Sequence, residues 1–318
     1  MAAAACLLLP PRDRFEAIEL DATLARMLGR GDRIDTGDDG RRAQLRRFVR
    51  MTPAHWSLAA LSRQQEHGDA GDSAWLRVDP VHVRPDINGA RLLGWGDGLQ
   101  LSREEADAFV AALRPLFGDA QLSLDTTALD ATTPDRWYLR MAPGTPLPEF
   151  RDPAEALGTD LGDDIDTTPQ HRRWRTLESE VQVVLHNHPA NRQRASRGLP
   201  PVNSVWCWGG GVLPQSVERM DGWTLASRDP SVRILAQASG GGDELPSAWT
   251  LPDRDTAFDL HRVVKPEAIV SDWLAPAAEA LRHGKLRLLA LDFADGLRWR
   301  LERQHKWRIL RRPVQTLS

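Results

Sequence analysis

The pattern of apolar and polar positions predicts an α/β protein with a mixed sheet flanked by helices. Apolar residues recur at helical spacing over 14–29 and 177–188, and 271–283 has the same character. The clearest helix follows Ser102-Arg-Glu-Glu105, which has the form of a capping box, and its apolar positions continue to Phe117. We therefore expect helices to form one layer of the core.

Short apolar runs between turn residues predict the strands of the sheet. Two of these runs end in glycine triplets, Gly209–Gly211 and Gly240–Gly242, and Asp295-Gly296 predicts a hairpin turn. The expected strands are 6–9, 75–84, 91–95, 121–125, 137–141, 205–208, 232–238, 286–293, 297–303 and 305–310.

The order of these elements predicts two regions, although the sequence also allows one continuous domain. Residues 1–65 begin with a buried strand and continue mainly as helices, with a Gly- and Asp-rich break at 36–40. Residues 66–318 carry the strands and helices of the α/β region, which contains all the candidate site residues.

Composition and charge exclude several classes of protein. The 318 residues are 41% hydrophobic and 27% charged with a net charge of -3, so the whole chain does not attract nucleic acids or acidic membranes. The two cysteines, Cys6 and Cys207, are far apart and predict neither a disulfide framework nor a zinc site. No apolar run approaches the roughly 20 residues that span a bilayer. We expect a cytoplasmic protein without membrane contact.

The segment His186–Gly211 carries the densest candidate chemistry. It combines a helix end before Pro189, three arginines, two tryptophans and a glycine-rich loop that we expect to be flexible. Arginine forks and the N–H groups of a glycine turn suit an anionic or phosphorylated group. In the alternative interpretation, His188 only caps a helix, the arginines form a solvated loop and the tryptophans belong to the core. Local chemistry by itself favours this alternative.

The same segment resembles a block of the archaeal-type cofactor-independent phosphoglycerate mutases, which belong to the alkaline-phosphatase-like superfamily. Weaker similarity at Ser102–Ala108 and Asp135–Arg140 extends the likeness to about 75–240. The resemblance implies that part of this chain shares the α/β fold of those enzymes. The matching residues of the block are His188-Pro-Ala-Asn191, Arg192, Arg194, Gly198, Pro201, Asn203 and Trp206–Gly211.

Over nearly the whole length, the chain more closely resembles the RpfE-type regulatory proteins of bacterial pathogenicity-factor clusters. Trp75–His82, Arg136–Leu139, Leu147–Phe150 and the His188–Gly211 block carry this match. The resemblance implies a cytoplasmic bacterial protein that is linked to the regulation of virulence factors. It implies no defined molecular mechanism.

The residues that such mutases use in catalysis are not found. The resemblance implies two divalent metals held by aspartates and histidines, and a serine nucleophile, because phosphoryl transfer needs charge neutralisation. The first strand should end in a metal-binding aspartate, but Leu9 is followed by Pro10, and Asp13 is misplaced. Asp72-Ser73 lies in a polar turn, and Asp292 is followed by phenylalanine where a Gly-Asp-His motif would place histidine. We expect no catalytic residues, no metal and no cofactor.

Other candidate groups have simpler interpretations. Asp79, His82 and Arg84 lie near a strand end and could line a pocket, but ordinary strand-end hydrogen bonding is favoured. His186 and His188 point in different directions on a helix, which disfavours shared metal ligation. Cys207 lies in an expected strand, which favours a buried and inert thiol.

The tail 297–318 is strongly basic, with Glu302 as its single acid, and contains Trp299 and Trp307. Nucleic-acid contact is one interpretation, but alternating basic and apolar residues are also typical of a half-buried strand, which we favour. Only this tail would support nucleic-acid binding, and we do not expect it.

A block that resembles the mutases, beside a missing metal centre, favours a non-catalytic regulatory or ligand-binding protein on a degenerate phosphoglycerate-mutase-like scaffold. Its partner would be a small anionic or phosphorylated ligand, or another protein. The rival hypothesis is a phosphoryl-transfer enzyme, a phosphomutase or phosphatase, with a rearranged site around Asp79, His82, His188 and Arg192. The predicted ligand-binding residues are His188, Asn191, Arg192, Arg194, Asn203, Trp206, Trp208, Gly209, Gly211, Asp79, His82 and Arg136.

Overall fold

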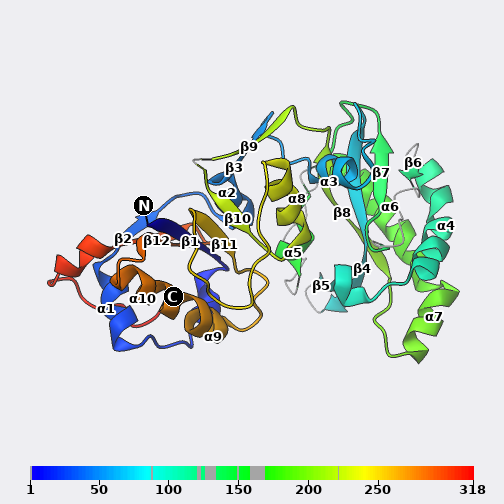
Figure 1. Cartoon of the computed structure of the whole chain (residues 1–318). Helices are drawn as coiled ribbons and strands as arrows, with labels where there is room; N and C mark the ends of the chain where they lie inside the picture. The colour runs from blue at the N-terminus through cyan, green and yellow to red at the C-terminus, as the bar shows by residue number, and fades with distance from the viewer. Residues whose placement is uncertain are drawn as a thin grey trace. The chain divides into compact units, whose positions relative to one another are not determined.

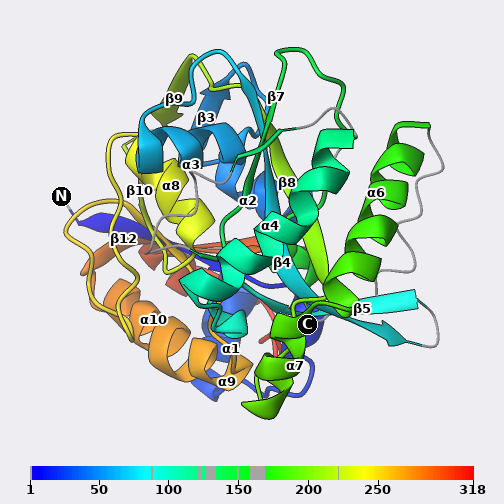
Figure 2. The ribbon, with the colours of Figure 1, turned by 90° about the vertical axis from the view of Figure 1, so that its right-hand side faces the viewer.

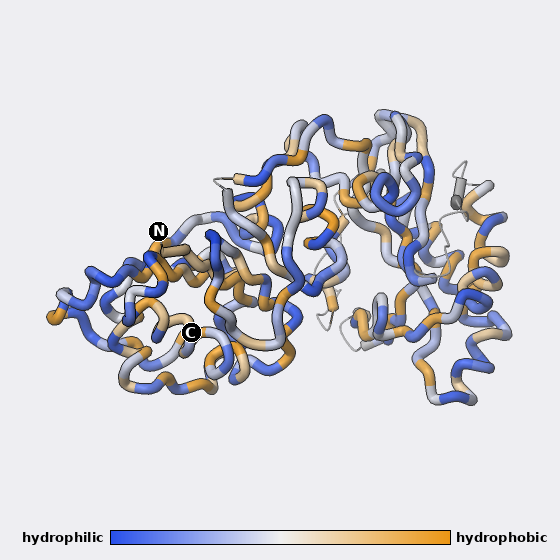
Figure 3. The backbone as a smooth tube through the Cα atoms, viewed as in Figure 1, coloured by the Kyte–Doolittle hydropathy of each residue, from blue (hydrophilic) through white to orange (hydrophobic). Residues whose placement is uncertain are grey.

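The chain forms two compact units, each with its own sheet and helices (Figure 1). The computed structural model describes residues 2–86, 89–119, 123–125, 134–148, 150–157, 169–220 and 222–318. Unit 1 consists of Met1–Thr52 and Ser216–Ser318, and unit 2 is the continuous stretch Pro53–Gln215. Figure 3 shows apolar and polar stretches alternating along the chain within both units. The expected fold class, a mixed α/β protein with sheets flanked by helices, is confirmed.

Unit 1 is built on a six-stranded mixed sheet. Its order is β10 (Thr224–Ala226), β11 (Thr256–Asp259), β1 (Ala3–Leu9), β12 (Leu286–Phe293), β13 (Leu297–Glu302) and β2 (Asp32–Asp35). β1 runs parallel to both neighbours, β11 and β12, and all seven of its residues are buried. A strand that is covered on both faces is apolar throughout, which explains the run Ala3–Leu9.

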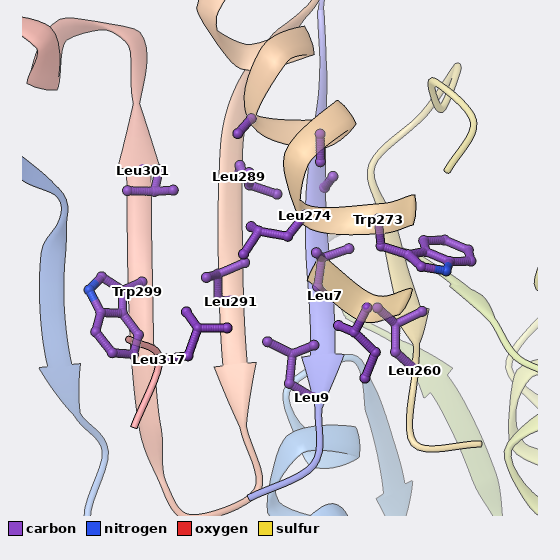
Figure 4. Close-up of a cluster of buried hydrophobic side chains, with 14 of the residues drawn as sticks. Leu7, Leu9, Leu260, Trp273, Leu274, Leu289, Leu291, Trp299, Leu301 and Leu317 are labelled. Atoms are coloured by element: carbon purple, nitrogen blue, oxygen red, sulfur yellow. The ribbon is translucent and has the colours of Figure 1, made fainter. Parts of the chain in front are cut away.

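Helical segments of unit 1 cover this sheet. Figure 4 shows Trp273 and Leu274 beside leucines of β1 and β12, including Leu7 and Leu291. Trp273 and Leu274 belong to a π-helical turn, Val270–Leu274, that joins α9 to α10. The helices are α1 (Ala22–Arg30), α2 (Gly40–Arg46), α8 (Pro230–Ala238), α9 (Pro266–Ile269) and α10 (Ala275–Arg282), with 3₁₀ turns at Arg12–Phe15 (η1) and Arg303–Trp307 (η4).

A two-stranded sheet in unit 1 brackets unit 2 along the chain. β3 (Val49–Thr52) and β9 (Ser216–Arg219) are antiparallel, and Thr52 lies opposite Ser216. The chain therefore leaves unit 1 and returns to it at one pair of facing residues.

Unit 2 contains a second sheet with β4 at its centre. β4 pairs with β5, β7 and β8, and β6 pairs with β7. Figure 2 shows the helices that accompany this sheet. The strands are β4 (Ala74–Asp86), β5 (Gly89–Trp95), β6 (Ser123–Asp125), β7 (Tyr138–Met141) and β8 (Ser204–Gly211). The helices are α3 (Leu58–His67), α4 (Arg103–Asp119), α5 (Pro153–Ala156), α6 (Pro169–His186) and α7 (Pro189–Ser196), with a 3₁₀ turn at Gly96–Leu99 (η2).

Alternate residues of β4 face different cores. Leu76 and Val78 belong to a large apolar cluster with residues of α4 and α6, such as Phe109 and Val181. Trp75 belongs to a smaller cluster with residues of α3 and with Tyr138. Because strand residues alternate between the two faces of a sheet, Arg77 and Asp79 lie on the face of Trp75. This second face carries charged groups in its interior.

Pro80 is accommodated inside β4 because of a gap in the pairing. The carbonyl of Val81 accepts a hydrogen bond from Asn203 beside β8, so the backbone of the preceding residue, Pro80, points to the opposite edge. On that edge the pairing with β7 ends at Arg77, and the pairing with β5 begins at Val81. Neither β7 nor β5 pairs with β4 at Pro80, so the missing N–H of proline breaks no hydrogen bond between these strands.

Several predicted elements differ from the structure. The predicted strand 232–238 is wrong, because Asp229 caps a helix, Pro230 takes its first position, and Val232 and Leu235 share its buried side. The predicted last strand 305–310 is also wrong, because 303–307 forms η4. The hairpin formed by 286–293 and 297–303 is confirmed as β12 and β13.

The first 65 residues are less helical than expected, since they also contain β2 and β3. The two units do not follow the predicted division at residue 65. The first strand, β1, lies between two strands from the end of the chain, so residues 1–52 share their sheet with the last third of the sequence.

Candidate functional site

His188, at the start of the predicted segment, caps a helix. Its Nδ1 accepts a hydrogen bond from the Ala190 N–H at 3.2 Å, at the first turn of α7. Its ring packs against Phe109, with ring centroids 4.8 Å apart, and burial lowers the pKa of the imidazole. The cap and the packing orient His188 within the fold, and His186 is exposed in the last turn of α6.

The two predicted asparagines connect backbone segments. The Asn191 amide donates to the carbonyls of Leu185 and Val202 and accepts from the Val202 N–H, all within 2.9 Å. The Asn203 amide accepts from the Val83 N–H at 2.8 Å and donates to the Val83 carbonyl at 2.7 Å. Their amide groups therefore hold the loop between α7 and β8 in place.

Arg194 is buried in a network with the capping box of α4. Its guanidinium donates to Glu105 at 2.6 Å and to the carbonyl oxygens of Pro200 and Leu99. The predicted capping box is confirmed, because Glu105 accepts from the Ser102 N–H while Ser102 accepts from the Glu105 N–H. The side chain of Arg194 is thereby fully engaged inside the protein.

Trp208 and Asp79 meet in the interior of unit 2. The Trp208 indole N–H donates to Asp79 Oδ2 at 2.8 Å, and the Trp95 indole N–H donates to the same oxygen at 3.1 Å. Arg77 contributes two hydrogen bonds of 2.8 Å to the carboxylate, one to each oxygen. Asp79 has no exposed surface. Four N–H groups therefore surround one buried carboxylate.

Arg136 joins the edge of this network through Glu66. It pairs with Glu66, which also accepts the Tyr138 hydroxyl at 2.7 Å. The guanidinium of Arg77 lies over the rings of both Tyr138 and Trp208, at 5.2 and 5.1 Å from their centroids. Aromatic faces stabilise a buried guanidinium, so this arrangement holds Arg77 between the two groups.

Asp135 adds a second carboxyl near the buried pair. Burial raises the pKa of Asp135, and the nearby Asp79 raises it further, whereas Arg77 lowers it. The network around Asp79 and Arg77 therefore lies close to a second carboxyl group, that of Asp135, which is easier to protonate than usual.

The glycines of the predicted loop are part of strand β8. A Cβ atom on Gly210 would lie 2.5 Å from Leu147 Cδ1, and one on Gly211 would lie 2.8 Å from Ser57 Cβ. Gly209 has a φ of +66° and a Cβ there would be 3.2 Å from the Ala59 nitrogen. The expectation of a flexible glycine loop is wrong, because Gly209 and Gly211 allow strand β8 to pack closely against the start of α3, and Gly210 allows it to approach Leu147.

The structure thus brings together only some of the predicted ligand-binding residues. Asp79, Trp208 and, through Glu66 and Tyr138, Arg136 belong to one network. His188, Asn191 and Arg194 lie around α7 and α4, Arg192 is exposed on α7, and Trp206 donates to the Arg151 carbonyl at 2.8 Å. Ligand binding by the whole set stays a prediction.

His82 lies near Asn203. Burial and the neighbouring Arg84 lower the pKa of His82, and its Nδ1 is a buried atom without a hydrogen-bond partner among the described residues. The favoured interpretation, strand-end hydrogen bonding of Asp79, His82 and Arg84, therefore leaves one nitrogen of His82 without a partner among the described residues.

Sequence reasoning missed a cluster of carboxylates in unit 1. Asp259 is the last residue of β11, Asp229 follows β10, and Asp292 is next to last in β12. Because these strands run parallel to β1, their carboxyl ends lie at one edge of the sheet, where α/β proteins commonly place ligand sites. Each of the three carboxylates is at most 2% exposed.

Arginines neutralise these carboxylates. The guanidinium of Arg41 donates to Asp229 at 3.0 Å and to Asp259 at 2.8 Å, and Arg41 is itself only 4% exposed. Arg47 donates to both oxygens of Asp292 at 3.1 and 3.2 Å, and Arg298 lies 3.1 Å from the same carboxylate. Burial alone would raise the pKa of Asp259, but Arg41 and hydrogen bonds reverse this effect and lower it.

His261 completes the cluster through Gln44. Its Nε2 lies 2.8 Å from Gln44 Oε1, while the Gln44 amide donates to the carbonyls of Leu9 and Asp292. Burial lowers the pKa of His261 to about 4, although Asp259 opposes the shift. At neutral pH His261 is therefore an uncharged imidazole.

These residues do not fit the two divalent metals that the mutase resemblance implies. Metal ions bind carboxylate oxygens that are free to coordinate, whereas Asp229 and Asp259 both bind Arg41. Within the part of the chain that the structure describes, no group of three or more His, Cys, Asp or Glu side chains is placed to hold a metal ion.

A sequence signal for this cluster did exist. Asp292 lies at the end of a strand that was predicted, and Asp259 ends a short buried run, Thr256–Asp259. Asp229 was not recognised as a residue that follows a strand, because the helix after it was itself predicted as a strand. Arg41 gave no signal, since an arginine in a polar stretch is normally exposed.

The remaining predictions on single residues concern the cysteines and the membrane. Burial raises the pKa of the Cys6 thiol to about 12 and also raises that of Cys207, and both cysteines are free. Such thiols are poor nucleophiles.

Among the described helices, none has the length and apolar character needed to cross a bilayer.

Comparison with curated proteins finds short matches to phosphoglycerate mutases. A 2,3-bisphosphoglycerate-independent phosphoglycerate mutase of Methanothrix thermoacetophila is 31% identical over 62 residues, which are 20% of this chain and 16% of the relative. A probable enzyme of the same name from Geobacter sulfurreducens is 46% identical over 39 residues, 12% of this chain and 10% of the relative. One from Methanosarcina mazei is 28% identical over 114 residues, 30% of this chain and 27% of the relative.

Solved structures show a distant likeness. The match to a protein of Pyrococcus horikoshii covers 95% of this chain and 88% of that protein, with 13% sequence identity and a TM-score of 0.45. The match to the cofactor-independent phosphoglycerate mutase of Thermoplasma acidophilum covers 94% of this chain and 90% of that enzyme, with 12% sequence identity and a TM-score of 0.39. No family model matches the chain. The matched segments span no more than 27% of the length of the curated relatives above. The chain is thus distantly similar, over part of its length, to cofactor-independent phosphoglycerate mutases.

Proposed function

We propose that this chain is a non-catalytic regulatory or ligand-binding protein on a phosphoglycerate-mutase-like scaffold. The observation that carries the proposal is the position of Arg41 between Asp229 and Asp259 at the carboxyl edge of the sheet. A buried guanidinium supplies the positive charge that the two carboxylates need, so they need no metal ion.

The geometry makes this neutralisation hard to reverse. Removing one partner of a buried ion pair leaves the other charge without compensation, at a cost of roughly 3–5 kcal/mol. A divalent cation that bound Asp229 and Asp259 would have to displace Arg41, which is almost wholly enclosed. Asp292 is paired with Arg47, whose side chain is only partly buried, and with Arg298.

The finer parts of the proposal rest on resemblance. The likeness to RpfE-type proteins supports a role in the regulation of virulence factors in a bacterial cytoplasm. The partner would be a small anionic or phosphorylated molecule or another protein, without nucleic acid or membrane contact. Arg192, which is exposed, is the residue of the predicted segment that is best placed to bind such a partner.

A phosphoryl-transfer enzyme is the second candidate, because the similar curated proteins are phosphoglycerate mutases. A rearranged site around Asp79 and His188 would need both side chains near one substrate. Asp79 is instead enclosed by Arg77 and two indoles, and His188 caps α7. The geometry therefore favours the non-catalytic function.

Enzyme assays with defined metal content test the proposal. Purified protein should show no phosphoglycerate mutase or phosphatase turnover above background, with or without added manganese, and elemental analysis should find less than stoichiometric metal. Asp259→Asn and His188→Ala variants distinguish the two candidate centres. Metal-dependent turnover in the unmodified protein that either variant abolishes would overturn the proposal.

A further inference from the structure

A cavity of about 250 Å³ lies in unit 1, away from the strand-end carboxylates. It is formed by α1, the end of α10, β13 and η4, so the basic tail 297–318 contributes Arg303 and Lys306 to its wall, but none of the predicted ligand-binding residues lines it. All of its walls belong to unit 1, whose sheet and core fix their positions. We infer that this cavity binds a small amphipathic anion, a molecule with an apolar body and a single carboxylate or phosphate group.

The inner part of the cavity suits the apolar body. Leu281 and Leu301 are 1% and 2% exposed and line it together with the half-buried Met27. An apolar ligand surface here would replace water against leucine side chains, which is favourable by about 25 cal/mol per Å². Scaling from a cavity of about 150 Å³ that holds benzene, the volume admits roughly ten non-hydrogen atoms.

The rim of the cavity is positively charged. Arg26 and Arg30 come from α1, Arg282 from the end of α10, and Arg303 and Lys306 from η4. Glu302 is the only carboxylate among the lining residues. The whole chain has a net charge of -3, so this concentration of cations is local and opposite in sign to the molecule.

The single carboxylate does not neutralise the rim, because it has its own partners. Glu302 lies 2.6 Å from Arg300 and accepts a hydrogen bond from Gln304 at 2.5 Å. It also takes part in the capping box of η4 with His305. Arg282 contacts Glu279 only in an exposed pair at 3.6 Å, which is a weak interaction.

Contacts within the wall hold the cations around the cavity. Arg30 donates to the Lys306 carbonyl at 3.1 Å, and its own carbonyl accepts from Arg308. His305 is 5% exposed and is held by the Glu302 N–H and by Asp32. The guanidinium of Arg30 retains further N–H groups that can bind an anion in a bidentate manner.

Charge complementarity and shape together define the ligand class. An inorganic anion would leave the apolar floor unused, and a neutral apolar molecule would leave the rim unpaired. Octanoate and phenyl phosphate each combine both features at about the size that the cavity admits, and they serve as probes. The inference stands apart from the proposed absence of catalysis, since a binding measurement and a turnover assay can fail independently.

The test is titration of the full-length protein by isothermal calorimetry. Octanoate or phenyl phosphate should bind with a dissociation constant below about 1 mM, and inorganic phosphate and 1-octanol should each bind at least about tenfold more weakly. Arg26→Glu should weaken probe binding by about tenfold or more, because it reverses a charge at the rim. Met27→Trp, which fills the cavity, should weaken it as well.

Arg46→Glu is the matched control, because Arg46 is exposed on α2 and does not line the cavity. It should leave probe binding within about twofold. All three variants should keep the melting temperature of the parent within a few degrees, which shows that they are folded. The inference is overturned if neither probe binds, or if Arg46→Glu weakens probe binding as much as Arg26→Glu. It is also overturned if phosphate and 1-octanol bind as tightly as the probes and a short oligonucleotide displaces the probes.

Discussion

Asp79 is held by a set of donors that leaves it no contact with solvent. Its two oxygens accept four N–H groups, two from Arg77 and one each from Trp95 and Trp208. Local sequence suggested strand-end hydrogen bonding for this residue, and the structure confirms hydrogen bonding, although in the middle of β4. The sequence could not indicate Trp95 as a partner, because the two residues meet only when β5 pairs with β4.

We expect Asp79→Ala to lower the free energy of unfolding by about 3–5 kcal/mol, because Arg77 would remain buried without its counter-charge. Urea denaturation measures the change. Asp107→Ala is the control, since Asp107 forms an exposed i,i+4 pair with Arg103 and should cost no more than about 1 kcal/mol. Equal effects of the two substitutions would contradict the role given to the buried pair.

At the scale of the element, strand β8 depends on its glycines for packing. Gly210 has an ordinary backbone conformation, but a Cβ atom would meet Leu147 at 2.5 Å and Leu76 at 3.1 Å. Both contacts are with side chains in the apolar layer below β4. The restriction at this position is therefore one of space and not of φ.

Gly210→Ala should lower the free energy of unfolding by about 1–3 kcal/mol, as expected for overpacking. Gly118→Ala should have the opposite sign, because Gly118 lies in α4 with open space around it, and alanine favours helix by up to about 1 kcal/mol. Thermal unfolding of the two single variants checks both signs. A neutral Gly210→Ala would mean that β8 does not approach Leu147 as closely as described.

Elements with clear local signals were predictable, and those that depend on distant contacts were not. Ser102 and Glu105 form the capping box that their spacing predicted. The strand prediction for 232–238 failed because the apolar positions alone fit either element, and the cap at Asp229 was overlooked. Strand β3 was not predicted, because residues 1–65 were expected to be mainly helical and its partner strand β9 lies more than 160 residues away in the sequence.

The candidate sites follow the same rule. The capping role of His188 was accessible from sequence as the alternative interpretation, and the structure gives His188 this contact, whereas no role in joining backbone segments was predicted for Asn191. The Arg41 pairs with Asp229 and Asp259 join segments 188 and 218 positions apart. Only the strand order of the sheet brings such residues together, and that order was not predicted.

At the scale of the whole molecule, unit 2 occupies one continuous stretch and has its own two apolar clusters. We expect a fragment of residues 53–215 to fold by itself and to unfold cooperatively in urea. The complementary chain, with Thr52 joined to Ser216 through an Asn-Gly turn, should also fold, because these residues face each other in an antiparallel pair. Fragment 53–215 remaining without a cooperative transition would show that unit 2 needs the rest of the chain.

The position of β1 between β11 and β12 has a consequence for how the protein is made. On a ribosome, Ala3–Leu9 emerges well before Thr256–Asp259 and Leu286–Phe293, and it must wait until both of these partner strands exist. At about 5–20 residues per second, that delay is on the order of tens of seconds. Pro53–Gln215 is complete well before then and can fold during synthesis. The apolar strand β1 is thus a segment of the nascent chain that a chaperone would have to protect until the last third of the sequence is made.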